Sequence, residues 1–196
     1  MNRRQTSVLL VDDHALVRQG FRKILEGDDS IKVVGEVSNG TDAVTAAAKL
    51  RPDVIVMDVT MPQLNGIEAT RRILKSSNHT QVLALSMHKD RVYVREMLKA
   101  GAKGYLLKDS ADEDLIAAIH ALARGDGYLS PAVSAMVLND YSRHVRDPID
   151  LLSSREREIM QLLAEGQTNK TIAQQLDLSV YTVDDHRGRI MAKLNL

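Results

Sequence analysis

The sequence predicts an α/β domain built on a doubly wound, five-stranded parallel sheet, followed by a small all-α helix-turn-helix domain. Three observations support this prediction. Short apolar runs alternate with amphipathic stretches over the first 125 residues, several of these runs lack polar alternation, and no strand-like run follows residue 151. Strands that alternate with helices and are covered on both faces are typical of parallel sheets.

The five expected strands are rich in Val, Ile and Leu, and a stretch with helical periodicity follows each of them. The strands are SVLLV (7–11), IKVVGEV (31–37), DVIVMD (53–58), QVLALS (81–86) and GYLLK (104–108). The helices are expected near 15–26, 40–50, 66–77, 91–100 and 112–124. Together these elements define a first domain at 6–125, in which ligands are expected at the carboxyl ends of the strands.

Glycine and proline interrupt this pattern in GDGYLSP (125–131). We expect residues 126–150 to be a linker with one helix at 132–145, because RDPID (146–150) is a second break.

The last segment, 151–196, predicts three helices. Ser153 or Ser154 caps the first, with Glu156 or Glu158 available to close a capping box. Gly166 ends this helix. The expected helices are 155–166, 168–178 and 180–194, and Ser179 caps the third. A tight turn between the last two suggests a helix-turn-helix, with Ile172, Leu176, Val183, Ile190 and Leu194 facing its core.

The composition indicates an ordinary globular protein, with a net charge of zero, no cysteine, no tryptophan and one phenylalanine. No apolar run approaches the roughly 20 residues that span a bilayer. We therefore expect no membrane segment, and the absence of cysteine is compatible with a reducing cytoplasm. Few aromatic residues are available for stacking single-stranded bases.

The tetrapeptide Val-Asp-Asp-His occurs twice, and its first copy directly follows the first strand. Asp12 and Asp13 directly follow that strand, Asp58 ends the third and Lys108 ends the fifth, so these groups are expected at one edge of the sheet. Adjacent carboxylates suit Mg²⁺, which prefers oxygen ligands. A lysine beside a metal and acids suits a phosphoryl group transferred to a carboxylate, with the Ser86 hydroxyl nearby. Alternatively, each aspartate only caps the helix that follows it.

These residues resemble the receiver domain of two-component response regulators, which has a flavodoxin-like fold. The resemblance covers about 6–125 and rests on Asp12-Asp13, Asp58-Val59-Thr60-Met61-Pro62, Asn65-Gly66, Ser86, Tyr105 and Lys108.

The resemblance implies that Asp58 is the phosphoacceptor and that a sensor histidine kinase is the donor. Asp13 and Asp58 would bind Mg²⁺ directly with the Thr60 backbone carbonyl, and Asp12 through water. Ser86 and Lys108 would contact the phosphoryl group. Tyr105 would be the aromatic residue that changes rotamer on activation and fills space that Ser86 vacates.

Two positions near this pocket need separate interpretation. Many receivers have proline after the lysine, whereas this chain has Lys108-Asp109. A cis bond without proline costs roughly 3 kcal/mol, so we expect trans. His14 starts a helix, and we expect a capping or surface role for it rather than metal ligation.

The second copy, Val183–His186, lies inside the last predicted helix. From periodicity alone its aspartates belong to a solvated polar face. The surrounding residues, however, resemble the LuxR-type helix-turn-helix. This resemblance covers 151–196 and rests on Leu152–Glu158, Gly166, Thr168–Lys170, Ile172-Ala173, Leu176, Ser179, Thr182-Val183, His186, Ile190 and Lys193-Leu194.

The LuxR-type resemblance implies that helix 180–194 enters the major groove of double-stranded DNA. The expected DNA contacts are Thr168, Asn169, Lys170, Tyr181, Thr182, Asp184, Asp185, Gly188, Arg189 and Lys193. Residues from 151 onward include six basic and six acidic side chains. Because phosphate neutralisation supplies most non-specific affinity, this balance predicts weak binding by a monomer and pairing on two half-sites. Asp184 or Asp185 is expected to read cytosine N4.

A receiver joined to this domain resembles the NarL/FixJ type of transcriptional response regulator. The resemblance implies a phosphorylation-controlled DNA-binding regulator that forms a homodimer when phosphorylated and is not an enzyme. Two other classes stay open from the sequence. One is a phosphatase with an aspartyl-phosphate intermediate, and the other is an interaction protein without a DNA role. The family pattern normally continues with one more helix after Lys193-Leu194, which leaves dimer formation and DNA binding by this chain open.

Overall fold

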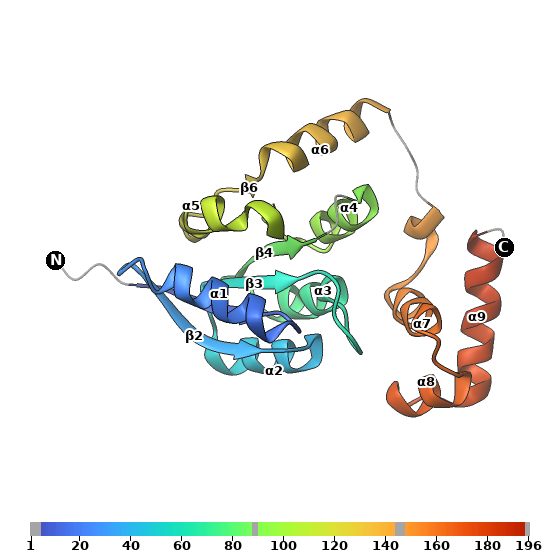
Figure 1. Ribbon diagram of the computed structural model, residues 1–196. Coiled ribbons are helices and arrows are strands. Elements are labelled where there is room, and N and C mark those ends of the chain that lie inside the picture. The colour runs from blue at the N-terminus through green and yellow to red at the C-terminus, as the bar shows by residue number, and fades with distance from the viewer. Residues whose placement is uncertain (1–4, 88–89, 144–147, 195–196) are drawn as a thin grey trace. The chain divides into compact units, whose positions relative to one another are not determined.

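A parallel sheet of six strands lies at the centre of the first of two units in the computed structural model, which describes residues 5–87, 90–143 and 148–194 (Figure 1). The units are Met1–Ser142 and Arg143–Leu196. The strands are β1 (Thr6–Val11), β2 (Ile31–Val37), β3 (Val54–Asp58), β4 (Gln81–Ser86), β5 (Gly104–Leu107) and β6 (Tyr128–Leu129). Their order is β2-β1-β3-β4-β5-β6, so the expected parallel α/β sheet is confirmed.

The sixth strand is a correction to the predicted linker at 126–150. Tyr128 and Leu129 pair in parallel with Gly104 and Tyr105 of β5, and the Ser130 backbone N–H donates to the Tyr105 carbonyl over 3.1 Å. Val133 in the next helix is buried in the core. The first unit therefore takes in the predicted linker as far as Ser142.

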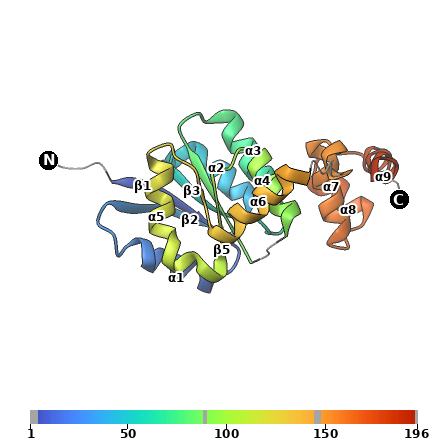
Figure 2. The ribbon, with the colours of Figure 1, turned by 90° about the horizontal axis from the view of Figure 1, so that it is seen from above.

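Helices cover both faces of the sheet (Figure 2). They are α1 (Ala15–Leu25), α2 (Gly40–Leu50), α3 (Gly66–Ser76), α4 (Arg91–Lys99), α5 (Ala111–Ala123) and α6 (Pro131–Arg143). All six expected helices are present with small shifts at their ends, and the predicted end of the last one at 145 lies outside the described residues. Helices α1 and α5 pack on one face, and α2, α3, α4 and α6 pack on the other.

The alternating direction of side chains along each strand explains how one sheet contributes to two hydrophobic cores. Leu9 and Val11 of β1 point into the cluster under α2, α3 and α4, whereas Val8 and Leu10 point toward α1 and α5. All four side chains are at most 1% exposed. Because successive side chains of a strand point to opposite faces, an uninterrupted apolar run fills both cores.

The second unit contains a short 3₁₀ turn (Pro148–Leu151) and the helices α7 (Ser154–Ala164), α8 (Asn169–Gln175) and α9 (Val180–Leu194). Ser153 and Glu156 form the expected capping box, and Ser179 accepts from the Thr182 N–H over 3.0 Å. The core joins Ile159 and Leu162 to the predicted apolar residues of α8 and α9. The helix-turn-helix prediction is therefore confirmed for the described part of this unit.

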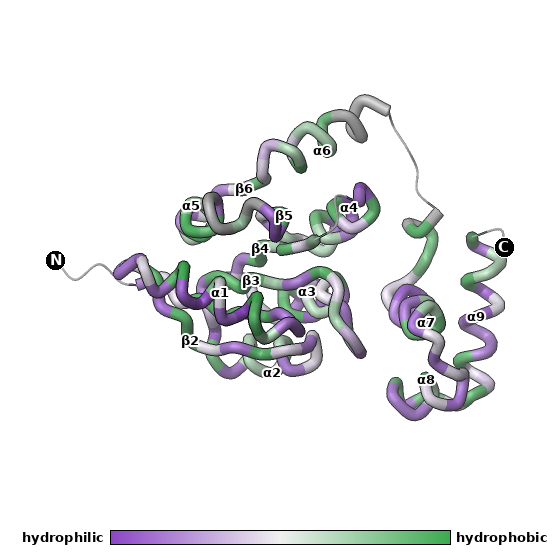
Figure 3. Tube along the Cα trace, in the orientation of Figure 1, coloured by the Kyte–Doolittle hydropathy of each residue, from purple (hydrophilic) through white to green (hydrophobic). Residues whose placement is uncertain are grey.

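Hydropathy follows these two architectures (Figure 3). The strands are rich in hydrophobic residues, whereas α9 alternates hydrophilic and hydrophobic positions. Within the described ranges, every helix is too short or too polar to span a membrane.

Candidate phosphoacceptor site and candidate nucleic-acid interface

The carboxyl ends of the central strands bring the predicted acidic residues together. Asp12 follows β1, Asp58 is the last residue of β3, and Lys108 directly follows β5. Strand order reverses between β1 and β3, the point at which doubly wound sheets bind ligands. The topology alone therefore predicts the position of this pocket.

Lys108 joins the two buried carboxylates. Its Nζ lies 2.7 Å from Asp12 Oδ2 and 2.7 Å from Asp58 Oδ2. The three side chains are only 4%, 4% and 1% exposed, respectively. Burial of two carboxylates beside one ammonium leaves a negative pocket that favours a further cation.

Burial and ion pairing act in opposite directions on the pKa values in this pocket. Burial raises the pKa of Asp58, and the hydrogen bond from Lys108 opposes this shift without cancelling it. For Lys108, burial lowers the pKa, but the bonds to Asp12 and Asp58 outweigh burial and leave it raised. The lysine therefore stays cationic, and the Asp58 carboxylate is held in surroundings that destabilise its charge.

The three carboxylates predicted to bind a divalent metal lie close enough to share one ion, and the ring of His14, which was not a predicted ligand, lies with them. One ligand atom each of Asp12, Asp13, His14 and Asp58 lies within 4.8 Å of the others. Asp13 is the more accessible carboxylate, with its side chain 30% exposed. Three carboxylates at one edge match the oxygen preference of Mg²⁺, so the acidic cluster fits the expected metal.

The loop after β3 holds Asp58 through contacts of its own backbone. The Thr60 N–H donates to Asp58 Oδ1 over 3.3 Å, and the Gly66 N–H donates to the Val59 carbonyl over 3.0 Å. A Cβ at Gly66 would lie 1.9 Å from the Asp58 carbonyl oxygen. The Asn65 side chain caps α3 by accepting from the Glu68 N–H over 2.9 Å. The Asn65-Gly66 pair thus starts α3 directly against the end of β3.

Ser86 and Tyr105 lie deeper than the acids. Ser86 is the last residue of β4 and is fully buried, at the same end of the sheet as Asp58. Tyr105 is also fully buried, and burial raises its pKa to about 12, with the Ser86 hydroxyl acting in the opposite direction. The proposed switch residue is therefore already turned inward in this structure.

Arg18 is a positioning residue that sequence patterns did not single out. Its Nη1 donates to the Asp12 carbonyl over 2.6 Å, and its Nε lies 3.3 Å from Glu36 Oε2. An arginine on a helix face ordinarily suggests a solvated surface, so the only available signal was its location one turn after His14. The Lys108–Asp109 bond is trans, as expected, as is every described peptide bond.

In the second unit, most of the predicted DNA contacts lie on the surface. Tyr181 is 84% exposed, and Thr168, Lys170 and Gly188 are exposed as well. Four others pair with one another. Asp184 Oδ1 accepts from Asn169 Nδ2 over 3.1 Å, and Asp185 lies 2.8 Å from Arg189 Nη2.

Lys193 makes a tertiary contact with another helix. Its Nζ lies 2.9 and 2.7 Å from the two oxygens of Glu156 on α7. Burial tends to raise the pKa of Glu156, but Lys193 and the Ser153 cap lower it to about 2. This lysine therefore joins α9 to α7 in the described structure.

A phosphoacceptor-like pocket in one unit and a helix-turn-helix in the other define a regulator that couples an acidic receiver to an output domain. A family model described as "Response regulator receiver domain" matches residues 8–120, and one described as "Bacterial regulatory proteins, luxR family" matches 150–196. The chain belongs to the response regulators that join a receiver to a LuxR-family domain, a class of transcriptional regulators.

Named relatives support this assignment over nearly the whole chain. The chain is 40% identical to oxygen regulatory protein NreC of Staphylococcus carnosus, covering 96% of this chain and 91% of the relative. It is 36% identical to transcriptional regulatory protein DegU of Brevibacillus brevis, covering 100% and 90%. RcsB of Salmonella enterica serovar Typhimurium, solved bound to promoter P1flhDC with the phosphomimetic BeF₃⁻, gives a TM-score of 0.71 at 29% identity, covering 98% and 93%.

Proposed function

We propose that this chain is a phosphorylation-controlled DNA-binding regulator of the bacterial cytoplasm, and that Asp58 accepts a phosphoryl group from a sensor histidine kinase. The observation that carries this proposal is the buried Asp58 carboxylate, 2.7 Å from Lys108 and beside Asp12 and Asp13. An ordinary surface aspartate has neither a buried ammonium partner nor two neighbouring acids.

The transfer step follows from the roles of these groups. An Asp58 carboxylate oxygen attacks the phosphorus of a phosphohistidine, an acyl–phosphate bond forms, and the P–N bond breaks with its electron pair left on the imidazole. Asp12, Asp13, Asp58 and the Thr60 carbonyl would hold Mg²⁺, which would offset the negative charge of the phosphoryl oxygens. Lys108 supplies a fixed positive charge on the same side as Asp58 Oδ2.

Slow loss of the phosphoryl group fits this pocket better than enzymatic turnover. Thr60, two residues after Asp58, offers no carboxylate to act as a general base toward water. The chain therefore acts as a phosphoryl acceptor with self-dephosphorylation at most.

Phosphorylation would affect the second unit through Ser86, Tyr105 and β6. The phosphoryl group adds roughly −1.5 to −2 charge at Asp58, which draws Ser86 and Lys108 toward it. Tyr105 is already buried, so the rearrangement would consist of small shifts around an inward ring rather than entry of an exposed one. Because the Tyr105 carbonyl accepts from the Ser130 N–H, such shifts would move the start of α6, which leads along the chain to the second unit.

The exposed face of α9, together with the start of α8, is the proposed DNA-reading surface. The side chains that would approach the bases are Tyr181, Thr182, Asp184, Asp185, Gly188 and Arg189. Thr168 and Lys170 would approach the phosphates. Lys193 is not in this set because its ammonium is paired with Glu156 of another helix, α7, whereas the partner of Arg189 lies on α9 itself. A neutral domain needs two copies for adequate affinity, which supports a homodimer on paired half-sites when phosphorylated.

A small-molecule phosphodonor tests the acceptor directly. Wild-type chain incubated with acetyl phosphate and Mg²⁺ should gain the mass of one phosphoryl group, and peptide mapping should place it on Asp58. Asp58→Asn should gain none. The control Asp29→Asn removes an exposed carboxylate and should label like wild type. Equal labelling of Asp58→Asn and wild type would contradict the proposal.

A further inference from the structure

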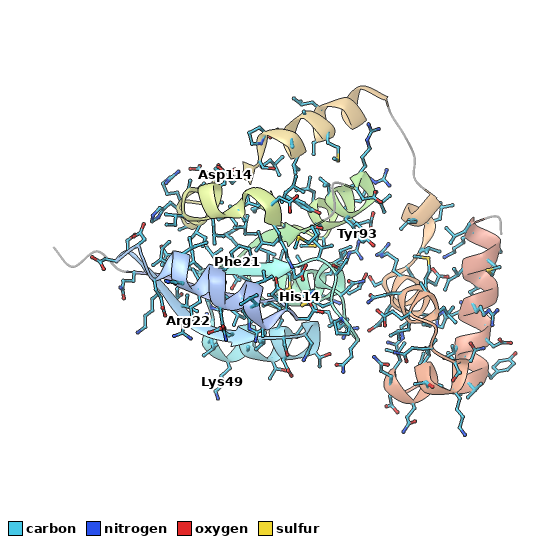
Figure 4. All side chains as sticks on the ribbon, in the orientation of Figure 1. His14, Phe21, Arg22, Lys49, Tyr93 and Asp114 are labelled. Atoms are coloured by element: carbon cyan, nitrogen blue, oxygen red, sulfur yellow. The ribbon has the colours of Figure 1, made fainter. Side chains whose placement is uncertain are left out.

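The imidazole of His14 faces the acidic cluster, although the phosphoacceptor chemistry requires no histidine on this chain. Its Nδ1 lies 2.8 Å from Asp13 Oδ1 and 3.4 Å from Asp12 Oδ1. The ring makes no capping bond to the described start of α1, although His14 occupies the N-cap position. Figure 4 labels this side chain in the first unit. With its side chain 67% exposed, the ring has room to adjust its position.

The carboxylate oxygens divide into two groups around this ring. Asp12 Oδ2 and Asp58 Oδ2 face Lys108. Asp12 Oδ1 instead accepts from the His14 backbone N–H over 2.9 Å and, with Asp13 Oδ1, faces the His14 ring. A cation bound between the Oδ1 atoms would therefore lie on the opposite side of the carboxylates from the lysine and next to a ring nitrogen.

The side chains of the cluster lie close enough together for one ion to contact all of them. Metal–oxygen bonds of 2.0–2.1 Å place adjacent ligands about 3 Å apart and opposite ligands about 4.2 Å apart. The distances of 2.8 and 3.4 Å lie near the value for adjacent ligands, and the ligand atoms of Asp12, Asp13, His14 and Asp58 all lie within 4.8 Å of one another. Small side-chain movements would complete such an arrangement.

We infer that His14 contributes a neutral nitrogen ligand to the divalent-metal site and shifts its selectivity toward transition-metal ions relative to Mg²⁺. Imidazole binds such ions much better than it binds Mg²⁺, which prefers oxygen ligands. The inference deepens the proposed function, since it rests on the carboxylates binding a metal. It replaces our expectation that His14 has only a capping or surface role.

The 2.8 Å contact between His14 and Asp13 has a second explanation, a hydrogen bond from a protonated ring to the carboxylate. The two explanations differ in the metal-loaded protein. A hydrogen-bonding imidazolium has no lone pair to donate at Nδ1, so it would stay outside the coordination sphere. A ligating imidazole would place its nitrogen directly on the ion.

Electron spin-echo spectroscopy on the Mn²⁺-loaded chain distinguishes metal ligation by His14 from a hydrogen bond to Asp13. Wild-type protein should show nuclear modulation from a directly bound ¹⁴N, and His14→Asn should show none. Asn is a favourable N-cap residue, so this variant should fold. The control His79→Asn removes an exposed histidine that bonds Ser77 and Arg51 instead. Absence of ¹⁴N modulation in wild type, or its persistence in His14→Asn, would overturn the inference.

Metal titrations give an independent measurement. His14→Asn should weaken Co²⁺ binding by about tenfold or more while changing Mg²⁺ affinity less than about twofold. Equal losses for both ions, or none for Co²⁺, would contradict the inference. Asp13→Asn separates this inference from the proposed function. If Asp13→Asn loses Mn²⁺ while wild type lacks ¹⁴N modulation, only the role of His14 fails. If wild type binds no Mn²⁺ at these carboxylates, the metal site itself fails.

Discussion

Two segments of this chain share the sequence Val-Asp-Asp-His, and their surroundings give the same side chains different chemistry. In the first copy, Asp12 and Asp13 follow a buried strand, where Lys108 and Asp58 meet them. In the second copy, the residues belong to α9, and Asp184 and Asp185 pair with Asn169 and Arg189 on an exposed surface.

The comparison shows that burial and convergence, rather than residue type, make an acidic pair into a site. Strand ends bring together groups that are distant in sequence, and burial strengthens their electrostatic interaction. A helix instead spreads adjacent side chains about 100° apart, so the second pair interacts with separate neighbours.

Stability should differ most between substitutions of two glycines. Gly66 contacts the Asp58 backbone in the first site, and Gly188 lies on α9 with the second tetrapeptide. Gly66→Ala should destabilise the protein by about 3 kcal/mol, because the new Cβ would collide with the Asp58 carbonyl. Gly188→Ala on α9 meets nothing described within 4 Å and should stabilise by about 0.5–1 kcal/mol. Urea unfolding checks both. Similar effects of the two substitutions would show that the first pocket is not tightly packed.

Mg²⁺ should distinguish the two aspartate pairs by thermal unfolding of the receiver unit. At roughly 100 times the Kd, a bound ion stabilises the folded state by about 2.7 kcal/mol. Wild type and Asp184→Ala, Asp185→Ala should gain equally in Tm, whereas Asp13→Asn should gain little. A loss of the Mg²⁺ effect in the α9 double variant would contradict the separation of roles.

DNA binding, in contrast, should depend on the aspartate pair of α9. The Asp184→Ala, Asp185→Ala variant should lose roughly 1–3 kcal/mol of discrimination against altered base pairs and bind non-specific DNA more tightly. Without their aspartate partners, Asn169 and Arg189 could contact DNA and would contribute to the tighter binding. Asp177→Asn removes an acid outside α9 and is the control, since asparagine tolerates its positive φ of 52°. Unchanged base preference in the double variant would exclude base reading by these aspartates.

A smaller contrast is expected in pH dependence. Glu156 has its pKa lowered from 4.5 to about 2, so its pairing with Lys193 stabilises the fold above about pH 4.5 and is lost as pH falls toward 2. The Lys193→Met substitution should make the urea midpoint depend less on pH between about 4.5 and 2.

The pKa of Asp58 is raised by burial, so ionisation of this carboxyl group destabilises the fold as pH rises. The Asp58→Asn substitution should therefore increase stability at neutral pH. A destabilised Asp58→Asn would contradict the account of burial at this site.

Much of the fold and of the first site could be predicted because both follow from local patterns. Apolar runs define the strands, and the parallel topology then brings Asp12, Asp58 and Lys108 to one edge. Other features depend on tertiary contacts that leave no periodic signal. Strand β6 has only two residues and follows a glycine-rich break, and the Lys193–Glu156 pair joins residues 37 positions apart.

The orientation of single side chains was also beyond prediction. The helix-start position of His14 favoured a cap, whereas its ring faces Asp13. Tyr105 was expected to move on activation, but its full burial depends on packing among β5, β6 and the surrounding core. Rotamers of this kind are decided by neighbours rather than by sequence spacing.

The most direct test of the central claim is the effect of a phosphoryl mimic on DNA affinity. Fluorescence anisotropy with a duplex identified by genomic footprinting would compare wild type and Asp58→Asn, each with and without beryllofluoride and Mg²⁺. We predict that wild-type affinity rises by about tenfold, the scale of a typical coupling free energy, and that Asp58→Asn does not respond. An equal response of the two proteins, or no response of wild type, would contradict the claim that the first aspartate pocket controls the helix that carries the second.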